Sequence, residues 1–373
     1  MATARRHKTE PALSEPQQGQ GVTMTRNNLF EFLDHVHRVD YTDSRYRRMI
    51  RPVCIWGQAG IGKTEIVMDY ARSRGWDFAY CAPAQFEEMG DFHGMPVVEE
   101  GRTTYARPSW VPVSKGRPGI LLLDDFNRAD ERILKGMMQL FQNHGLMSWE
   151  LPLDWHIVCT ANPDQSDYAV TRLDEAMLTR LLHATLAFDH VAWAGWAIDN
   201  GIDRRGVDFV LTYPETALGR LTNPRTLTTF FRHTGGIADL NKDIRLVEAL
   251  GSSLLDRETV LAFLTFIRED LSAMPSAEEL LDTESFEVFE TSLRRMVCQG
   301  DAMRLDILGT LVTRLTHILS KVEPTESHIR NLIQFCQIEW LPNDIRTSLM
   351  IALPQSVSHR LAGVKSIARL MVS

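Results

Sequence analysis

Short apolar runs alternate with segments of helical apolar spacing along the first half of the chain. Each run has the length of a buried strand, and helical patterns over 63–74 and 132–143 lie between successive runs. Strands that alternate with helices predict a parallel sheet covered on both faces. We therefore expect an α/β core over residues 27–190 with five parallel strands, at 53–56, 78–82, 120–123, 157–160 and 182–188.

The strand signal fades after residue 190, and helical spacing takes over. This pattern predicts an α-helical lid over 191–270 and a C-terminal helical accessory region over 271–373. The first 26 residues lack apolar periodicity and are rich in Gln, Glu, Pro, Thr and Gly, so we expect a disordered tail there. Asn28 is the expected N-cap of the first helix. Helices are expected at 191–200, 207–212, 225–233, 244–255, 260–271, 303–318 and 328–338.

Charge and cysteine content narrow the classes of partner and compartment. The 373 residues carry a net charge of −8, which argues against a sequence-blind grip on nucleic acid, because that needs a basic face. Five cysteines without a C-x-x-C pair indicate reduced thiols in a cytoplasmic protein. The apolar run at 120–123 is too short to span a membrane, and no apolar stretch follows the basic residues near the N-terminus. No membrane partner is expected.

One segment between the first strand and its helix fits the phosphate-binding pattern G-x-x-x-x-G-K-[ST] in full. Its glycines allow the backbone to wrap around phosphate, and its N–H groups and the positive helix end point at the anion. The lysine would neutralise the β- and γ-phosphates, and the threonine hydroxyl would bind Mg²⁺. We expect ATP and Mg²⁺ as cofactors. The segment comprises Gly57, Gln58, Ala59, Gly60, Ile61, Gly62, Lys63 and Thr64.

Two acids end the apolar run at 120–123, Asp124 and Asp125. In a parallel sheet they would lie at the carboxyl edge beside the phosphate loop. We expect Asp124 to hold Mg²⁺, through water, and Asp125 to orient the attacking water. Asn162 follows the next strand and could bond the γ-phosphate or the lytic water, although Asn-Pro by itself is typical of a turn. The order of the motifs favours the first interpretation.

With these residues in this order, the sequence resembles the AAA+ superfamily and, within it, the MoxR-like ATPases. The segment 124–129, D-D-F-N-R-A, looks like that family's D-E-x-N-R-A, and 160–163 matches sensor 1. The stretch 173–180 is similar to the family's L-x-x-A-x-L-x-R, which implies that Arg180 is the arginine finger. Asn223 to Arg225 is similar to sensor 2, which implies that Arg225 reaches the nucleotide from the lid. The resemblance covers about residues 28–260.

The resemblance implies a Mg²⁺-dependent ATPase that works as a ring, a hexamer in the family. It also implies chaperone-like remodelling or activation of a partner protein, often one with a von Willebrand factor A domain. Two alternatives stay open: a nucleic-acid motor or loader, and a nucleotide-gated scaffold with weak hydrolysis. The scaffold is kept open by Asp125, which stands where the family usually has Glu, so its carboxylate lies about one C–C bond further back.

The segment 97–106 suggests a β-hairpin that turns near Glu100-Gly101. In MoxR-like proteins a hairpin inserted in the second helix occupies this place and faces the pore of the ring. A plain surface loop is the alternative.

Overall fold

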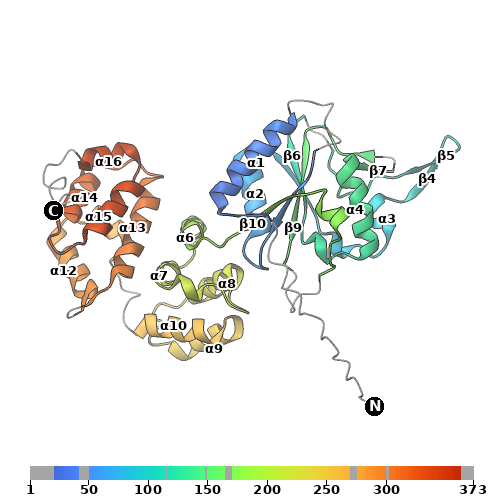
Figure 1. Cartoon of the computed structure of the whole chain (residues 1–373). Coiled ribbons are helices and arrows are strands. Elements are labelled where there is room, and N and C mark those ends of the chain that lie inside the picture. The colour runs from blue at the N-terminus through green and yellow to red at the C-terminus, as the bar shows by residue number, and fades with distance from the viewer. Residues whose placement is uncertain are drawn as a thin grey trace, which may run out of the picture. The chain divides into compact units, whose positions relative to one another are not determined.

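The computed structural model describes residues 21–41, 50–113, 116–147, 149–163, 170–268, 275–299 and 302–362. The chain forms two compact units, residues 1–188 and 189–373. The first unit holds the sheet and the second is almost entirely helical (Figure 1). Within the described residues, none of the helices combines the length and the apolar character needed to cross a membrane.

A six-stranded parallel sheet forms the centre of the first unit. Its strand order is β1-β10-β2-β9-β6-β3, and each neighbouring pair is parallel. The two most central strands, β2 and β9, are buried at every residue, as expected for strands covered on both faces. The strands are β1 (Val22–Met24), β2 (Val53–Trp56), β3 (Asp77–Cys81), β6 (Gly119–Leu123), β9 (Trp155–Ala161) and β10 (Leu182–Leu186).

The sheet corrects the expectation of five strands. The sixth strand, β1, lies in the segment that we expected to be a disordered tail, and it pairs with β10 at the edge of the sheet. The first helix, α1 (Arg26–Tyr41), begins before Asn28, which lies inside the helix and does not cap it. Residues 1–20 of the expected tail lie outside the described residues.

Helices cover the two faces of the sheet (Figure 1). Along β6, Ile120 and Leu122 pack with α1 and α2 (Lys63–Ser73) on one face. Leu121 and Leu123 pack on the other face, with the core that includes α4 (Glu131–Asn143). This alternation, with period two, gives the domain three layers. The remaining short elements of this unit are α3 (Met89–His93), α5 (Glu175–Leu178), η2 (Pro83–Gln85) and η3 (Phe126–Arg128).

Three buried cysteines lie on strands of this sheet, two of them on neighbouring strands. Cys54 of β2 is the register partner of Cys159 of β9, and Cys81 lies at the end of β3. Burial raises the pKa of all three thiols, that of Cys81 to about 12. They are therefore inert thiols at neutral pH.

The first unit also contains two small antiparallel hairpins. The expected hairpin is present, with β4 (Pro96–Glu99) antiparallel to β5 (Arg102–Tyr105). Its turn residues Glu100 and Gly101 have φ of 50° and 75°, as in the turns that best match the twist of a two-stranded ribbon. The second hairpin joins β7 (Gly145–Leu146) and β8 (Trp149–Glu150).

The second unit is built of helices α6 to α16 and the short antiparallel pair β11 and β12. Its first helices gather around clustered phenylalanines, among them Phe209, Phe231 and Phe263. The helices are α6 (His190–Asp199), α7 (Arg204–Thr212), η4 (Pro214–Thr216), α8 (Pro224–Thr234), α9 (Ile244–Leu254), α10 (Arg257–Arg268), α11 (Ala277–Asp282), α12 (Phe286–Val297), α13 (Leu305–Leu319), α14 (Glu326–Gln337), α15 (Asn343–Ala352) and α16 (Gln355–Ala362); the strands are β11 (Cys298–Gln299) and β12 (Ala302–Met303).

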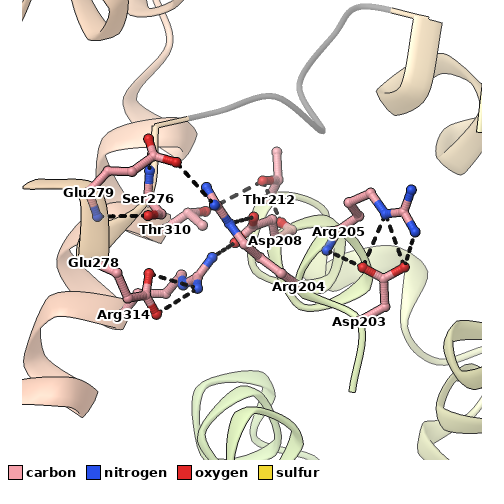
Figure 2. A network of polar contacts seen from close by, with 10 residues as sticks. All are labelled: Asp203, Arg204, Arg205, Asp208, Thr212, Ser276, Glu278, Glu279, Thr310 and Arg314. Atoms are coloured by element: carbon pink, nitrogen blue, oxygen red, sulfur yellow. Dashed lines mark hydrogen bonds and ion pairs between the residues drawn. The ribbon is translucent and has the colours of Figure 1, made fainter. Parts of the chain in front are cut away.

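A buried ionic network joins α7 to α11 and α13 within this unit (Figure 2). Asp208 of α7 is fully buried, and its two carboxylate oxygens accept from Arg314 at 2.8 Å and from Arg204 at 3.3 Å. Arg314, only 4% exposed, also donates to both oxygens of Glu278 at 3.2 Å. Burial raises the pKa of Asp208, and the two guanidinium groups oppose that rise. The network therefore links the expected lid to the expected accessory region.

Candidate nucleotide site

The phosphate-loop segment lies between the end of β2 and the start of α2. Gly60 and Gly62 have φ of 78° and 99°, a backbone conformation that glycine adopts at little cost. The N–H of Gly57 donates to the carbonyl of Ala161 at the end of β9, over 3.2 Å. The loop is thus anchored to the neighbouring strand, and α2 points its N-terminus at the space that the loop surrounds.

Lys63 is the first residue of α2 and is only 6% exposed. Its ammonium donates to the carbonyls of Gly57 at 2.8 Å and Gln58 at 3.1 Å, inside its own loop. It also donates to Oδ1 of Asn162 at 2.9 Å. A buried ammonium needs such oxygen partners. A phosphate entering the loop would offer the ammonium a charged acceptor instead of neutral ones.

Thr64 and Asp124 come together at the carboxyl edge of the sheet, as the sequence predicted for a Mg²⁺ site. The Thr64 hydroxyl donates to Oδ1 of Asp124 over 2.9 Å. A hydroxyl and a carboxylate oxygen are hard ligands of the kind that Mg²⁺ prefers, and Mg²⁺ usually keeps several waters of its own. The donor set therefore fits Mg²⁺ with phosphate and water as its other ligands.

Asp124 is also held by two further hydroxyl groups. Thr160 of β9 donates to Oδ1 over 2.6 Å, and Tyr80 of β3 donates to Oδ2 over 3.2 Å. Burial, followed by the neighbouring Asp124 carboxylate, raises the pKa of Tyr80, so its hydroxyl keeps its proton at neutral pH. Both carboxylate oxygens of Asp124 thus accept from side chains of neighbouring strands.

Asp125 adopts a left-handed backbone conformation, with φ of 47°. This conformation is uncommon for a residue with a side chain, although aspartate adopts it more readily than most, and it persists where surrounding contacts hold it. Its Oδ1 accepts from the amide nitrogen of Asn162 over 2.9 Å, and its Oδ2 lies 3.7 Å from Arg128. The carboxylate therefore lies between Asn162 and Arg128 at the carboxyl edge of the sheet.

Asn162 connects the loop to the acid. Its side chain accepts from Lys63 with one end and donates to Asp125 with the other. Its backbone is held by Asn127, whose amide donates to the carbonyl of Asn162 at 2.8 Å and accepts from its N–H at 3.2 Å. Asn162 is 1% exposed, so its amide position is set by these contacts. The interpretation of Asn162 as a plain turn residue does not account for them.

The two arginines lie in different parts of the chain. Arg180 lies in the turn between α5 and β10, and its guanidinium donates to the carbonyl of Ala176. Within the stretch 173–180 only α5 (Glu175–Leu178) is helical, and Asp174 caps it. Arg225 is exposed near the N-terminus of α8, where Asn223 caps the helix, and it belongs to the second unit. The roles of both arginines stay predictions.

Sequence reasoning missed three residues of the site: Thr160, Tyr80 and Asn127. Tyr80 and Thr160 lie in predicted strands, one residue before the end of β3 and of β9. A polar side chain at such a position, next to a phosphate loop, is the signal that could have found them. Asn127 belongs to the segment 124–129, whose resemblance to the family motif implies no particular role for it.

The comparisons with known proteins agree with this geometry in the nucleotide domain. Residues 52–181 match the family model described as an AAA domain of the dynein-related subfamily. None of the curated proteins compared with the chain matches it.

Among solved structures, two mutant forms of RuvB from Thermotoga maritima align with the chain at 11% and 12% identity. They cover 76% and 82% of this chain and 87% and 94% of their own, with a TM-score of 0.37 in each case. Such values carry nothing about substrate or partner. On the family match, the parallel sheet and the phosphate loop, this chain carries an AAA domain with the AAA+ P-loop fold.

Proposed function

We propose that this protein is an ATP-hydrolysing AAA+ ATPase that works as a ring and remodels or activates a partner protein, as MoxR-like ATPases do. One observation carries the proposal. Asn162 bonds both Lys63 of the phosphate loop and Asp125, so the group that would sense the γ-phosphate touches the group that would orient water. A purely structural loop has no need of that connection.

The residues divide the work of hydrolysis between them. The loop amides and Lys63 would bind the phosphates, and Thr64 and Asp124 would hold Mg²⁺, which neutralises charge on the β- and γ-phosphates. Asp125 would accept a hydrogen bond from the attacking water and turn its lone pair toward phosphorus. On binding ATP, the Lys63 ammonium would turn to the γ-phosphate and lose its bond to Oδ1 of Asn162. The Asn162 amide would then be available to contact the γ-phosphate.

ATP binding and turnover of purified protein test the enzyme proposal. Lys63→Ala should abolish or severely weaken ATP binding in a calorimetric titration, because it removes the buried ammonium. Lys135→Ala is the matched control: this lysine lies on the exposed face of α4, paired with Glu131 at 2.8 Å, and its loss should leave binding unchanged. Wild-type ATP affinity in the Lys63 variant would refute the assignment.

Ring assembly and the role of Arg180 rest on the family resemblance. We expect ATP to favour a hexamer, and Arg180 to act on ATP held by the neighbouring subunit, where such fingers contribute factors of about 10³–10⁵ in rate. Lys63→Ala and Arg180→Ala subunits, each inactive alone, should recover partial turnover when mixed, because mixed rings contain composite sites. Verified mixed rings without recovery would contradict action between subunits. Light scattering with a slowly hydrolysed ATP analogue measures assembly.

The partner is proposed to be a protein, with the hairpin β4–β5 as a contact surface. Val98 near its tip is 78% exposed. A von Willebrand factor A domain is the first client to test. Pull-down with an Asp125→Asn variant held in ATP should retain such a client, and a hairpin variant such as Val98→Ser should lose it.

A nucleotide-gated scaffold is the second candidate function. It is favoured by Asp125 itself, whose short side chain is already engaged by Asn162 and lies near Arg128. A scaffold would bind ATP tightly and assemble, yet turn over so slowly that Asp125→Asn changes little. The turnover number of the wild-type protein decides between the two.

A further inference from the structure

Three hydroxyl groups surround the two acids of the site, and one of them is completely buried. Thr160 is 0% exposed and lies on β9, one residue before the strand ends. Thr64 belongs to the phosphate loop, and Tyr80 is half exposed at the edge strand β3. Thr160 alone among the three contacts both acids.

The Thr160 hydroxyl makes one bond to each acid. It donates its proton to Oδ1 of Asp124 over 2.6 Å and accepts from the backbone N–H of Asp125 over 2.8 Å. A hydroxyl has a single proton, so the direction of both bonds is fixed: an N–H can only donate, and the carboxylate accepts. One atom therefore ties the side chain of the first acid to the backbone of the second.

The bond to Asp125 bears on an unusual piece of backbone. Asp125 is one of four non-glycine residues at positive φ among the described residues, and such conformations persist only where surrounding contacts enforce them. Its N–H has the Thr160 hydroxyl as acceptor. Without that acceptor, the chain after β6 would lose a contact that holds it in the left-handed turn.

We propose that Thr160 is a positioning residue for ATP hydrolysis, which sets the placement of the Asp124 carboxylate and the Asp125 side chain together. This inference rests on the proposed function. In the proposed function Asp124 would hold Mg²⁺ and Asp125 would orient water, and one hydroxyl on the central strand β9 bonds both residues. A misplacement of about 1 Å at such a site costs about 100-fold in rate.

Two substitutions separate the hydroxyl from the rest of the side chain. Thr160→Val keeps the shape and removes both hydrogen bonds, whereas Thr160→Ser keeps the hydroxyl and removes only a methyl group. We expect Thr160→Val to lower kcat by about 100-fold while ATP affinity changes by no more than about threefold. Thr160→Ser should keep kcat within about threefold of wild type, since positioning is retained.

A matched control removes a comparable hydroxyl elsewhere. Thr259 is 3% exposed in the second unit, and its hydroxyl bonds Thr222 and the carbonyl of Thr216, each at 3.0 Å. Thr259→Val should lower the melting temperature about as much as Thr160→Val does, and it should leave kcat unchanged. Equal kcat in Thr160→Val and wild type would overturn the proposal. So would equal losses in the Val and Ser variants, or a loss of nucleotide binding that parallels the loss of turnover.

A second readout does not depend on turnover. Mg²⁺ dependence of binding can be followed with a fluorescent, slowly hydrolysed ATP analogue, and half-saturation should shift to several-fold higher Mg²⁺ in Thr160→Val but not in Thr160→Ser or Thr259→Val. If wild type binds ATP with Mg²⁺ but shows no turnover, the proposed hydrolysis fails, and this titration still decides the placement of Asp124. Unchanged Mg²⁺ dependence in Thr160→Val would overturn that placement.

Discussion

The ammonium of Lys63 donates a hydrogen bond to Oδ1 of Asn162, over 2.9 Å, although the two residues are 99 positions apart in the chain. The contact exists because β2 and β9 are neighbours in the sheet, so the loop after one strand meets the residue after the other. The same amide group donates to Asp125 from its nitrogen. A single asparagine side chain thus connects the phosphate loop to the acid that would orient water.

Asn162→Ala removes that connection. We expect ATP affinity to change little, because the loop amides and Lys63 remain, and turnover to fall by about 100-fold, because Asp125 loses the donor that orients it. Steady-state kinetics together with calorimetric binding measure the two effects. Asn143→Ala, at the exposed C-terminal end of α4, is the control and should behave as wild type. Full activity in the Asn162 variant would show that this connection has no role in turnover.

Asp125 can be changed in two opposite directions. Asp125→Asn should bind ATP and lose hydrolysis, because an amide is a far poorer acceptor for the proton of water. Asp125→Glu should keep activity or raise it, because the longer side chain restores the reach that the AAA+ resemblance implies. Single-turnover phosphate release checks both variants. Hydrolysis at the wild-type rate in Asp125→Asn would mean that another group acts as the base.

Acid should destabilise the first unit through its buried histidines. His37 and His156 are 2% and 5% exposed, with ring centroids 4.1 Å apart, and burial lowers their pKa values to about 4 and about 2. In the unfolded chain a histidine titrates near about 6.5. The stability that these neutral rings contribute is therefore complete above pH 6.5. It decreases as pH falls, because the unfolded chain then binds protons that the folded protein excludes.

The expected loss approaches about 1.4 kcal/mol per pH unit for each histidine below about pH 6. For His37 the loss ends near its folded pKa of about 4, and for His156 it continues toward about 2. Urea unfolding of wild type and His37→Gln at pH 7.5, 6.5 and 5.5 measures the difference in slope. His35→Gln, on the exposed side of the same helix, is the control. Identical slopes in all three proteins would contradict a neutral buried His37.

The ionic network of the second unit predicts strong coupling between Asp208 and Arg314. Arg314→Met leaves a fully buried carboxylate with one remaining partner at 3.3 Å, and should cost about 3–5 kcal/mol in the free energy of unfolding. The double variant Asp208→Leu/Arg314→Met should cost much less than the sum of the single variants. Lys321→Met, which removes an exposed ion pair with Asp199, should cost less than about 1 kcal/mol. Additive losses would show that the two residues act independently.

The sequence predicted the parts of the site that local patterns encode. The phosphate loop and the acids after β6 are contiguous motifs beside strongly apolar strands, so their place at the carboxyl edge of the sheet could be predicted from spacing, while their chemistry stays a prediction. The edge strand β1 was missed because it is three residues long and includes a polar Thr23, and its pairing with β10, in which Thr23 is the register partner of Thr185, joins segments far apart in the chain.

The contacts around Thr160 could not be predicted for a related reason. Its bonds to Asp124 and Asp125 depend on the register between β6 and β9, in which Leu123 pairs with Cys159. A shift of one residue would turn the Thr160 hydroxyl to the opposite face of the sheet. The spacing of residues along the sequence does not reveal the order of the strands in the sheet. Contacts between side chains of different strands therefore became known only from the structure.

The alkylation rate of the three buried cysteines in the central sheet should report how often the nucleotide domain opens. Alkylating reagents attack the thiolate, and the raised pKa values of Cys54, Cys81 and Cys159 leave almost none at neutral pH. Their modification must therefore wait until the strands separate. Cys298 in the second unit is only half-buried, so its alkylation should not require the strands of the sheet to separate, and its rate serves as an internal reference. A nucleotide that binds only the closed sheet should lower the alkylation rate of these three cysteines by the factor 1 + [L]/Kd, so occupancy of the site can be measured without any partner protein.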